Sequence, residues 1–264
     1  NIVSNSLETS KYSAIVVDEA QDFGMRAFKL LRTLVDEGKN DLFIVGDAHQ
    51  RIYGHKVVLG QCEINVRGRS KKLKLNYRTT DEIRKWAVAL FNGENIDDLD
   101  EGTDSNRDYK SLYNGPKPEV KNFETFDEEV TYIHQYIENI KKTDNESKIC
   151  LVVRTQKLVD VYSDYFSKSN MKTIKISRNS KDDLSNTDVR IATMHRVKGL
   201  DFDHVIIASM NKGIVPLETI EKSDEDLINS ENLQKEKSLV FVAATRAKKS
   251  LLVTSYGITS EILR

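Results

Sequence analysis

Cysteine, proline and tryptophan are scarce in this chain of 264 residues, which contains two, three and one of them respectively. Cys62 and Cys150 are far apart, so the chain has neither a disulfide framework nor a zinc-binding spacing, and we expect two buried, reduced thiols. No apolar run approaches the ~18 residues of a membrane span, and the first residues lack the basic and apolar regions of a signal peptide. The sequence therefore predicts a cytoplasmic protein that does not enter a membrane.

An excess of charge of either sign is also missing. Forty lysines and arginines face 41 aspartates and glutamates, which leaves a formal net charge of −1 at pH 7. The 31% of charged residues, beside 39% of hydrophobic ones, is typical of a solvated globular protein rather than of a disordered chain. Because there is no overall basic field, any surface that binds nucleic acid must be local.

Short β-branched runs alternate with longer amphipathic stretches over most of the sequence. In the first third, we expect buried strands at 14–18 and 42–46, a β-rich stretch at 61–75 and helices at 25–37 and 81–91. Later in the chain, we expect strands at 120–123, 149–153, 189–194, 204–208 and 251–254. Helices are expected there at 128–140, 156–166 and 233–247. Strands that alternate with helices predict an α/β fold of parallel sheets flanked by helices.

A polar, acidic segment interrupts this alternation between residues 92 and 118, and it contains two of the three prolines. Such a composition is typical of a domain boundary or a flexible excursion. The sequence therefore predicts a first domain at 1–92, a linker or excursion at 93–117 and a second domain at 118–264.

Polar side chains follow the first two predicted strands of the chain. Asp18 and Glu19 come directly after one strand, and Gln50 and Tyr53 lie in the loop after the next. Ligands of open α/β sheets bind beyond the carboxyl ends of strands, where one carboxylate can hold Mg²⁺ while its neighbour polarises a water. An amide can hydrogen-bond a phosphate, and a tyrosine can stack on a base. A solvated helix start and a plain polar loop are the alternatives, but two such loops after consecutive strands favour a functional site.

Five segments resemble, in order, motifs II to VI of the UvrD/Rep family of superfamily 1 helicases: DEAQD at Asp18–Asp22, GDAHQRIY at Gly46–Tyr53, LNYRT at Leu75–Thr79, TMHRVKGLD at Thr193–Asp201 and FVAATRA at Phe241–Ala247. The resemblance implies RecA-like domains of the P-loop NTPase helicase fold. It also implies an ATP-dependent DNA helicase or translocase that uses ATP and Mg²⁺ and binds single-stranded DNA, with RNA not excluded. The sequence does not indicate an oligomeric state.

The family's roles can be transferred to matching positions of motifs II, III and V. Asp18 would bind the Mg²⁺ of Mg-ATP, Glu19 would be the general base for the hydrolytic water, and Gln50 would sense the γ-phosphate. Thr193 and His195 would contact the backbone of single-stranded nucleic acid. These assignments follow from the resemblance alone.

The resemblance also implies roles for residues of motifs IV, V and VI. Tyr77 would stack on the adenine, and Arg78 would reach the γ-phosphate. Arg246 would act as the arginine finger from the second domain. Asp201, at a position where the family usually has Glu, would lie near the ribose or near motif VI.

The segment after motif III departs from the family's pattern. Tyr53 would stack on a base, but His55 stands where family members often have an aromatic residue, so its stacking area is smaller. Lys56 follows where Arg is common, and it keeps a cation near the nucleic acid.

The phosphate-binding motif G-x-x-x-x-G-K-[ST] occurs nowhere in the 264 residues, although motif I of the family lies upstream of motif II. We interpret the chain as the C-terminal part of a longer motor with an incomplete first domain, through truncation, proteolysis or a split gene. The missing N-terminal motor segment would act in cis or in trans. The chain alone should be a poor ATPase, because no P-loop cradles the phosphates. The alternative is a catalytically silent module that binds nucleic acid or a partner with a degenerate motor fold.

Overall fold

Two groups of residues, neither continuous in sequence, form the folded units of the chain. The computed structural model describes residues 12–53, 57–92, 96–97, 103–104, 109–177, 186–218 and 226–263. Unit 1 consists of residues 1–73 and 93–107, and unit 2 consists of residues 74–92 and 108–264. This division differs from the predicted domain limits, because residues 74–92 group with the second unit.

Unit 1 contains a short parallel pair of strands covered on one side by a helix. Its elements are β1 (Ile15–Val17), η1 (Ala20–Asp22), α1 (Met25–Thr33), β2 (Leu42–Ile44), η2 (Ala48–Gln50), η3 (Leu59–Cys62), β4 (Ile96–Asp97) and β5 (Thr103–Asp104). β1 and β2 are parallel, with Ile15 opposite Leu42, whereas β4 and β5 form a separate antiparallel pair. Phe28 of α1 packs with Val17, Leu59 and other apolar side chains into the core of this unit.

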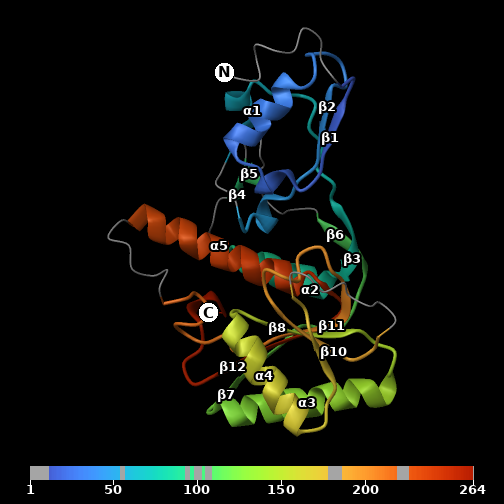
Figure 1. The fold of residues 1–264 in the computed structure, drawn as a ribbon, viewed down its shortest axis with the longest axis vertical. Coiled ribbons are helices and arrows are strands. Elements are labelled where there is room, and N and C mark those ends of the chain that lie inside the picture. The colour runs from blue at the N-terminus through green and yellow to red at the C-terminus, as the bar shows by residue number, and fades with distance from the viewer. Residues whose placement is uncertain are drawn as a thin grey trace. The chain divides into compact units, whose positions relative to one another are not determined.

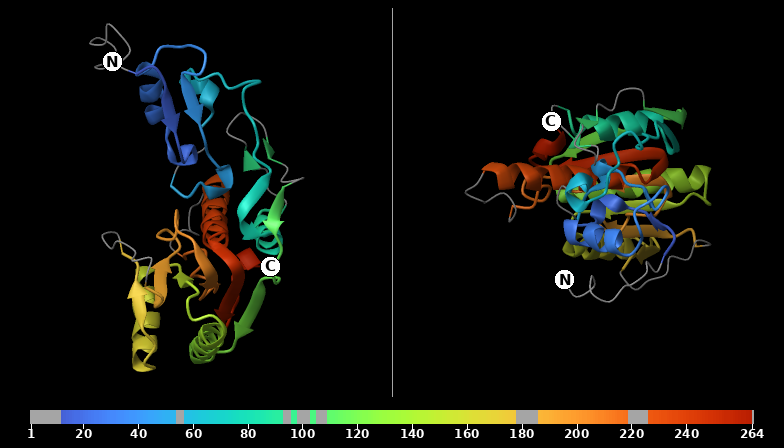
Figure 2. Two further views of the ribbon diagram at one scale, coloured as in Figure 1. Left: turned by 90° about the vertical axis from the view of Figure 1, so that its right-hand side faces the viewer. Right: turned by 90° about the horizontal axis from the view of Figure 1, so that it is seen from above.

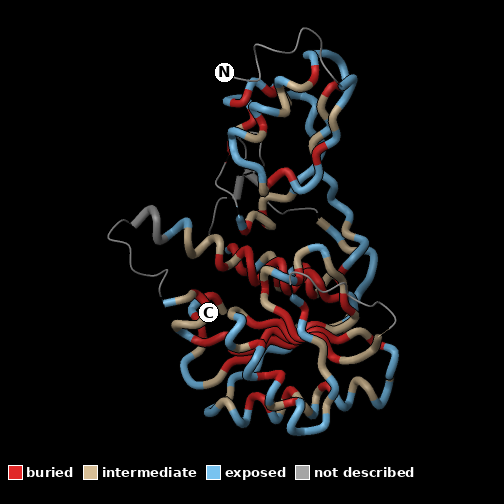
Figure 3. Tube along the Cα trace, in the orientation of Figure 1, coloured by how far each residue is buried: buried red, intermediate tan, exposed pale blue. Residues whose placement is uncertain are grey.

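Unit 2 is built around a six-stranded sheet in which all the paired strands are parallel. The strand order is β7 (Glu119–Phe123), β12 (Ala247–Tyr256), β11 (Phe202–Ile207), β8 (Ile149–Val153), β10 (Val189–Thr193) and β9 (Thr173–Lys175). Every residue of β8 is buried, as expected for a continuous apolar run in a parallel sheet that is covered on both faces. Figure 3 shows these strands as the most continuously buried part of the unit.

Helices cover both faces of this sheet. On one face lie α3 (Phe126–Thr143) and α4 (Gln156–Lys168), whose apolar sides form a cluster with Ile149, Leu151 and Val153. The other face is in contact with α5 (Asp226–Ala244), which also packs against α2 (Asp81–Ala89). Figures 1 and 2 show the resulting three layers within this unit.

A second, smaller sheet adjoins the main sheet of unit 2. Strand β3 (Leu75–Thr80) pairs in parallel with β6 (Lys110–Tyr113), and β3 leads directly into α2. The rings of Phe91 and Phe241 meet edge to face at 5.7 Å, which joins the end of this segment to α5. Residues 74–92, which precede the polar segment, are therefore part of unit 2. The unit closes with the short helix η4 (Glu261–Leu263).

The α/β fold with parallel sheets and flanking helices is confirmed, and most of the predicted elements lie within a few residues of observed ones. The β-rich stretch predicted at 61–75 is wrong, because residues 63–74 form turns and irregular chain. Both cysteines are free and buried. Within the described residues, no helix combines the length and the apolar character that crossing a membrane would require.

Asp81, at the first position of α2, links this helix to the small sheet. Its carboxylate contacts Lys85 at 2.7 Å and Arg84 at 2.8 Å, and it accepts the backbone N–H of Ser111. The hydrogen bond from Lys85 and the further ones from Arg84 and Ser111, partly opposed by burial, lower the pKa of Asp81 to about 2.

We expect Asp81→Asn to lower the free energy of unfolding of unit 2 by about 1–2 kcal/mol at pH 7. Because the folded-state pKa lies below that of the unfolded chain, this contribution is complete above pH ~4 and is lost as the pH falls through ~2. Urea unfolding at pH 7 and at pH ~2, followed by the fluorescence of Trp86 in α2, measures the difference in free energy of unfolding between the variant and the wild type. Asp127→Asn, an exposed carboxylate in the first turn of α3, is the matched control and should change stability by less than ~0.5 kcal/mol.

Candidate nucleotide and nucleic-acid sites

In unit 1, the loops after β1 and β2 are joined by a ladder of hydrogen bonds. The N–H of Val45 donates to the carbonyl of Val17 at 2.8 Å, and the N–H of Ala20 donates to the carbonyl of Val45 at 2.9 Å. Parallel strands place their carboxyl ends at the same edge, so this ladder holds motifs II and III side by side. The two polar loops predicted from the sequence therefore form one group.

The side chain of Gln21 connects these two motifs. It is buried, donates through Nε2 to the Glu19 carboxylate at 2.5 Å and accepts the N–H of Asp47 at 3.0 Å. Glu19 itself has a left-handed backbone with a φ of 52°, which is unusual for a residue with a side chain. The amide of Gln21 thus holds the predicted general base in a fixed orientation.

Asp47 organises the second loop. Its carboxylate accepts the N–H of His49 at 3.0 Å, lies 3.1 Å from the His49 ring and accepts Nε2 of Gln50 at 2.8 Å. Burial raises the pKa of Asp47, but the hydrogen bonds from His49 and Gln50, together with the charge of His49, outweigh this effect and leave the pKa below its ordinary value. The predicted phosphate sensor Gln50 is therefore oriented by an ionised carboxylate.

Asp18 is exposed just beyond the carboxyl end of β1, and its Oδ1 accepts the N–H of Glu19 at 2.8 Å. A carboxylate in this position fits Mg²⁺, which prefers oxygen ligands and is often held by one or two carboxylates with phosphates and waters. No group of three or more metal-binding side chains occurs among the described residues. Tyr53 is 60% exposed, and the predicted residues His55 and Lys56 lie outside the described residues.

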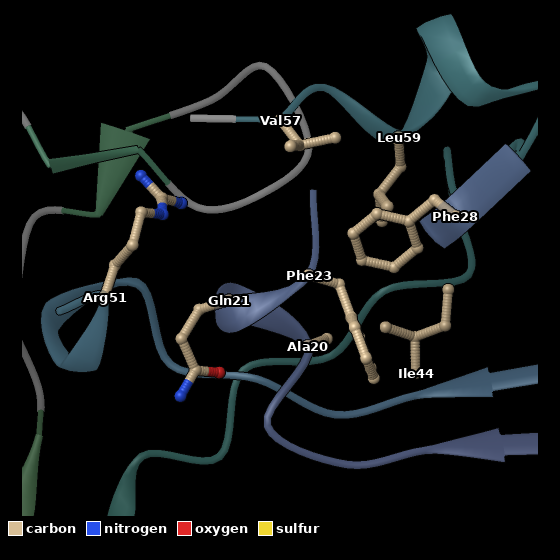
Figure 4. A pocket seen from close by; sticks show the side chains of 8 residues that line it. All are labelled: Ala20, Gln21, Phe23, Phe28, Ile44, Arg51, Val57 and Leu59. Carbon is tan, nitrogen blue, oxygen red and sulfur yellow. The ribbon is translucent and has the colours of Figure 1, made fainter. Parts of the chain in front are cut away.

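A pocket in unit 1 is lined in part by residues of motifs II and III, and Figure 4 shows Gln21 and Arg51 at one end of it. The rest of its wall is mostly apolar and includes Phe28 and Leu59. A nucleotide needs several hydrogen-bond donors for its phosphates, so this pocket is an extension of the apolar core rather than a phosphate site.

Unit 2 brings predicted nucleotide-binding residues together at the amino end of its sheet. Asp201 precedes β11, and its carboxylate lies 3.0 Å from Nε of Arg78 and 3.7 Å from Nζ of Lys248. The side chain of Asn76 accepts the N–H of Arg78 at 2.7 Å, within the irregular part of β3 where its register to β6 shifts. Tyr77 in the same part of β3 is 67% exposed, so its ring is available for stacking.

Arg246 lies beside this group. Its carbonyl accepts the N–H of Phe202, the residue after Asp201, at 3.0 Å. Its side chain is buried, and Nε donates to the carbonyl of Val242 at 3.1 Å in the last turn of α5. To act as an arginine finger, the guanidinium would have to leave this position, so its role stays a prediction.

The predicted nucleic-acid residues lie at the opposite, carboxyl edge of the same sheet. Thr193 ends β10, and His195 follows in a turn closed by a 2.8 Å hydrogen bond from the N–H of Arg196 to the carbonyl of Thr193. Burial lowers the pKa of His195, and Arg154 and Arg196 lower it further, while Glu236 acts in the opposite sense. Among the described residues, the structure thus separates the two predicted functions of unit 2 onto the two edges of one sheet.

Comparisons with known proteins identify the family of the chain. The family model described as UvrD-like helicase C-terminal domain matches residues 71–180 and 172–257, and the UvrD/REP helicase N-terminal domain matches residues 4–58. Since the first model covers well over half of the chain, the protein belongs to the UvrD-like helicase family.

Individual relatives match either a short stretch of the chain or nearly all of it at lower sequence identity. The ATP-dependent DNA helicase Rep of Buchnera aphidicola subsp. Schizaphis graminum is 39% identical over 66 residues, which are 25% of this chain and 9% of that protein. The probable DNA helicase of Mycoplasma pneumoniae is 22% identical over 268 residues, which are 96% of this chain and 45% of that protein. The chain therefore spans less than half the length of these curated relatives.

A solved structure supports the fold. The C-terminal domain of a possible DNA helicase from Lactobacillus plantarum WCFS1 superposes with a TM-score of 0.51 and 16% sequence identity, over 71% of this chain and 92% of that one. At this identity the likeness concerns the fold alone.

Several residues of these sites were missed by sequence reasoning. Gln21 and Asp47 stand inside the motifs that were recognised, and their polar side chains next to the predicted catalytic residues were the available signal. Arg154 and Glu236 carried no such signal, because they lie outside those motifs and 82 residues apart.

Motifs II and III approach each other closely at Gly46. A Cβ atom at this residue would lie 2.9 Å from Oε1 of Gln21 and 3.2 Å from Cβ of Ala20. Gly60 differs, because a Cβ there would meet nothing within 4 Å.

We expect Gly46→Ala to destabilise the junction by about 1–3 kcal/mol through overpacking, and so to reduce hydrogen-exchange protection roughly 5- to 150-fold in peptides over residues 15–22 and 42–50. Gly60→Ala should leave exchange in these peptides close to that of the wild type. Equal protection in both variants would show that the junction has room for a side chain.

Proposed function

We propose that this chain is part of an ATP-dependent DNA helicase or translocase that couples ATP hydrolysis to movement along single-stranded nucleic acid. The observation that carries the proposal is the separation within unit 2. Arg78, Asp201 and Arg246 lie at the amino edge of the sheet, and Thr193 and His195 lie at its carboxyl edge. One continuous segment, from Thr193 to Asp201, joins the two groups, as coupling of two ligands requires.

In this proposal, the residues of unit 1 handle the metal and the water. Asp18 holds Mg²⁺, Glu19 accepts the proton of the attacking water, and Gln50 responds to the γ-phosphate. The bound Mg²⁺ would neutralise the phosphate charge. The hydrogen bond from Gln21 supports the role of Glu19, since a general base must be oriented to work.

The residues of unit 2 supply cations and a stacking surface. Tyr77 stacks on the adenine, Arg78 and Arg246 approach the phosphates, and Asp201 lies near the ribose or motif VI. Asp201 pairs with Arg78 at 3.0 Å, which supports assigning both side chains to the same nucleotide site. Thr193 and His195 of unit 2 contact the nucleic acid, and Tyr53, His55 and Lys56 have the same role in unit 1. The relatives, which are described as DNA helicases, favour DNA over RNA.

A second candidate is a silent module that binds nucleic acid or a partner. The intact set of Asp18, Glu19, Gln50, Arg78 and Arg246 favours the motor, because binding alone has no need of a general base and two phosphate-directed arginines. In the motor proposal, the phosphate-binding loop is supplied by another segment, in cis or in trans.

The nucleic-acid role predicts that the 264-residue chain binds a fluorescein-labelled oligo(dT). His195→Ala should weaken this binding by about tenfold, whereas His134→Ala, a change on α3, should leave it unchanged. Fluorescence anisotropy titrations measure the Kd, and the melting temperatures of both variants show whether they fold. An unchanged Kd in a folded His195→Ala protein would remove motif V from the nucleic-acid surface.

The nucleotide role predicts little ATP hydrolysis by the chain itself, with or without oligo(dT), because no P-loop holds the β- and γ-phosphates. A longer protein that joins the chain to a Walker A segment should hydrolyse ATP in a DNA-dependent way. In that protein, Glu19→Gln should reduce kcat by about 10²–10⁴-fold through loss of the general base.

Phosphate release assays on both proteins give the answer. If the 264-residue chain alone shows DNA-stimulated turnover that Glu19→Gln abolishes, the proposal that its motor is incomplete is wrong. If the longer protein binds DNA but never hydrolyses ATP, the silent binding module is the better description.

A further inference from the structure

Arg154 and Glu236 form a buried ion pair outside the recognised motifs. Nη2 of Arg154 lies 2.6 Å from Oε1 of Glu236, and Nε lies 2.9 Å from Oε2, so the contact is bidentate. The two side chains are only 10% and 2% exposed. Buried ion pairs contribute little net stability compared with apolar side chains of similar size, so stability alone does not explain this one.

The pair joins three segments of unit 2 that are distant in sequence. Arg154 directly follows β8, and the carbonyl of the preceding Val153 accepts the N–H of Met194 at 2.9 Å. The Thr193–His195 turn is thereby placed beside Arg154. Glu236 lies on α5, and the charges of Arg154 and Glu236 both act on the ring of His195.

Helix α5 links the Arg154–Glu236 pair, at the carboxyl edge of the sheet, to the amino edge. About two turns separate Glu236 from the end of the helix at Ala244, and Arg246 follows with its carbonyl bound to Phe202. The segment from Met194 to Asp201 makes the same passage, because it leaves the end of β10 and reaches the start of the parallel β11. The ion pair is located where these two connections begin.

We propose that Arg154 and Glu236 are positioning residues that hold the Thr193–His195 turn against α5, so that the turn meets nucleic acid in one fixed orientation. The inference rests on the proposed nucleic-acid role of this turn. It adds two residues that contact neither ligand but determine how well the contacting residues bind.

The test replaces the pair by apolar side chains of similar size, Arg154→Met with Glu236→Leu, which leaves no unpaired charge in the interior. We expect a melting temperature within ~4 °C of the wild type and a Kd for oligo(dT) about tenfold higher. The control removes an exposed ion pair of the same unit, Lys175–Asp160 at 2.7 Å, by Lys175→Gln with Asp160→Asn. This control should change neither value.

A second readout needs no nucleic acid. The ring signals of the histidines, observed by NMR in the free chain and assigned with His195→Ala, report the surroundings of His195 directly. In the apolar double variant, we expect the His195 signal to shift and to broaden, while the signal of His134 stays in place. Should the double variant melt more than ~10 °C lower, Glu236→Gln, which preserves the shape of the side chain, takes its place with the same expectations.

A weaker Kd together with a displaced His195 signal supports the inference. A folded double variant with an unchanged Kd overturns it, whatever the His195 signal does, because the pair would then be structural only. If the wild-type chain itself fails to bind oligo(dT), the proposed function fails. The positioning of the turn is then decided by the His195 signal alone, and an unchanged signal overturns it.

Discussion

The parallel direction of the six strands in unit 2 is the constraint on which the rest of that unit depends. Because every strand runs the same way, the chain must return across a face of the sheet after each one. The return segments therefore begin at the carboxyl edge and end at the amino edge. Residues that are close in sequence, such as Thr193 and Asp201, are separated by about the length of a strand, whereas Arg78 and Asp201 meet although they are distant in sequence.

The same constraint explains why polar side chains are tolerated in this unit. The strand Ile149–Val153 lies between two helical layers and is apolar and buried throughout. Several buried polar groups lie in the helices and just beyond the strand ends, and they are paired with one another. Tyr162 bonds the buried carboxylate of Glu129 at 2.6 Å near one edge, and Arg154 bonds Glu236 in the same way. Apolar burial supplies the stability, while the paired groups set the orientation of the loops.

The elements that sequence reasoning located well are those whose surroundings are encoded locally. A continuous apolar run such as Ile149–Val153 can be stable only between two layers, so its strand was predicted with the observed limits. The stretch 61–75 failed because Cys62 and Ile64 alternate with polar residues as in a strand, yet Cys62 packs into the core of unit 1 from the end of η3 and Ile64 packs there from irregular chain.

The domain limit and the detailed site depend on contacts between distant parts of the chain. Residues 74–92 belong to unit 2 because β3 pairs with β6 and Phe91 meets Phe241, which no local pattern announces. The motifs located Glu19 and His195, but they could not reveal the side chains that hold them, since Gln21 bonds Asp47 and Arg154 bonds Glu236 across long stretches of sequence.

The second half of α5 has a mechanical consequence. All residues from Leu239 to Ala244 are buried, so this part of the helix has no solvent side along which it could slide or roll. A displacement at Arg246 would therefore be passed to β11 and β12, with which α5 is in contact, rather than absorbed by a local shift of the helix. Because both strands are hydrogen-bonded within the six-stranded sheet, helix and strands would move as one body.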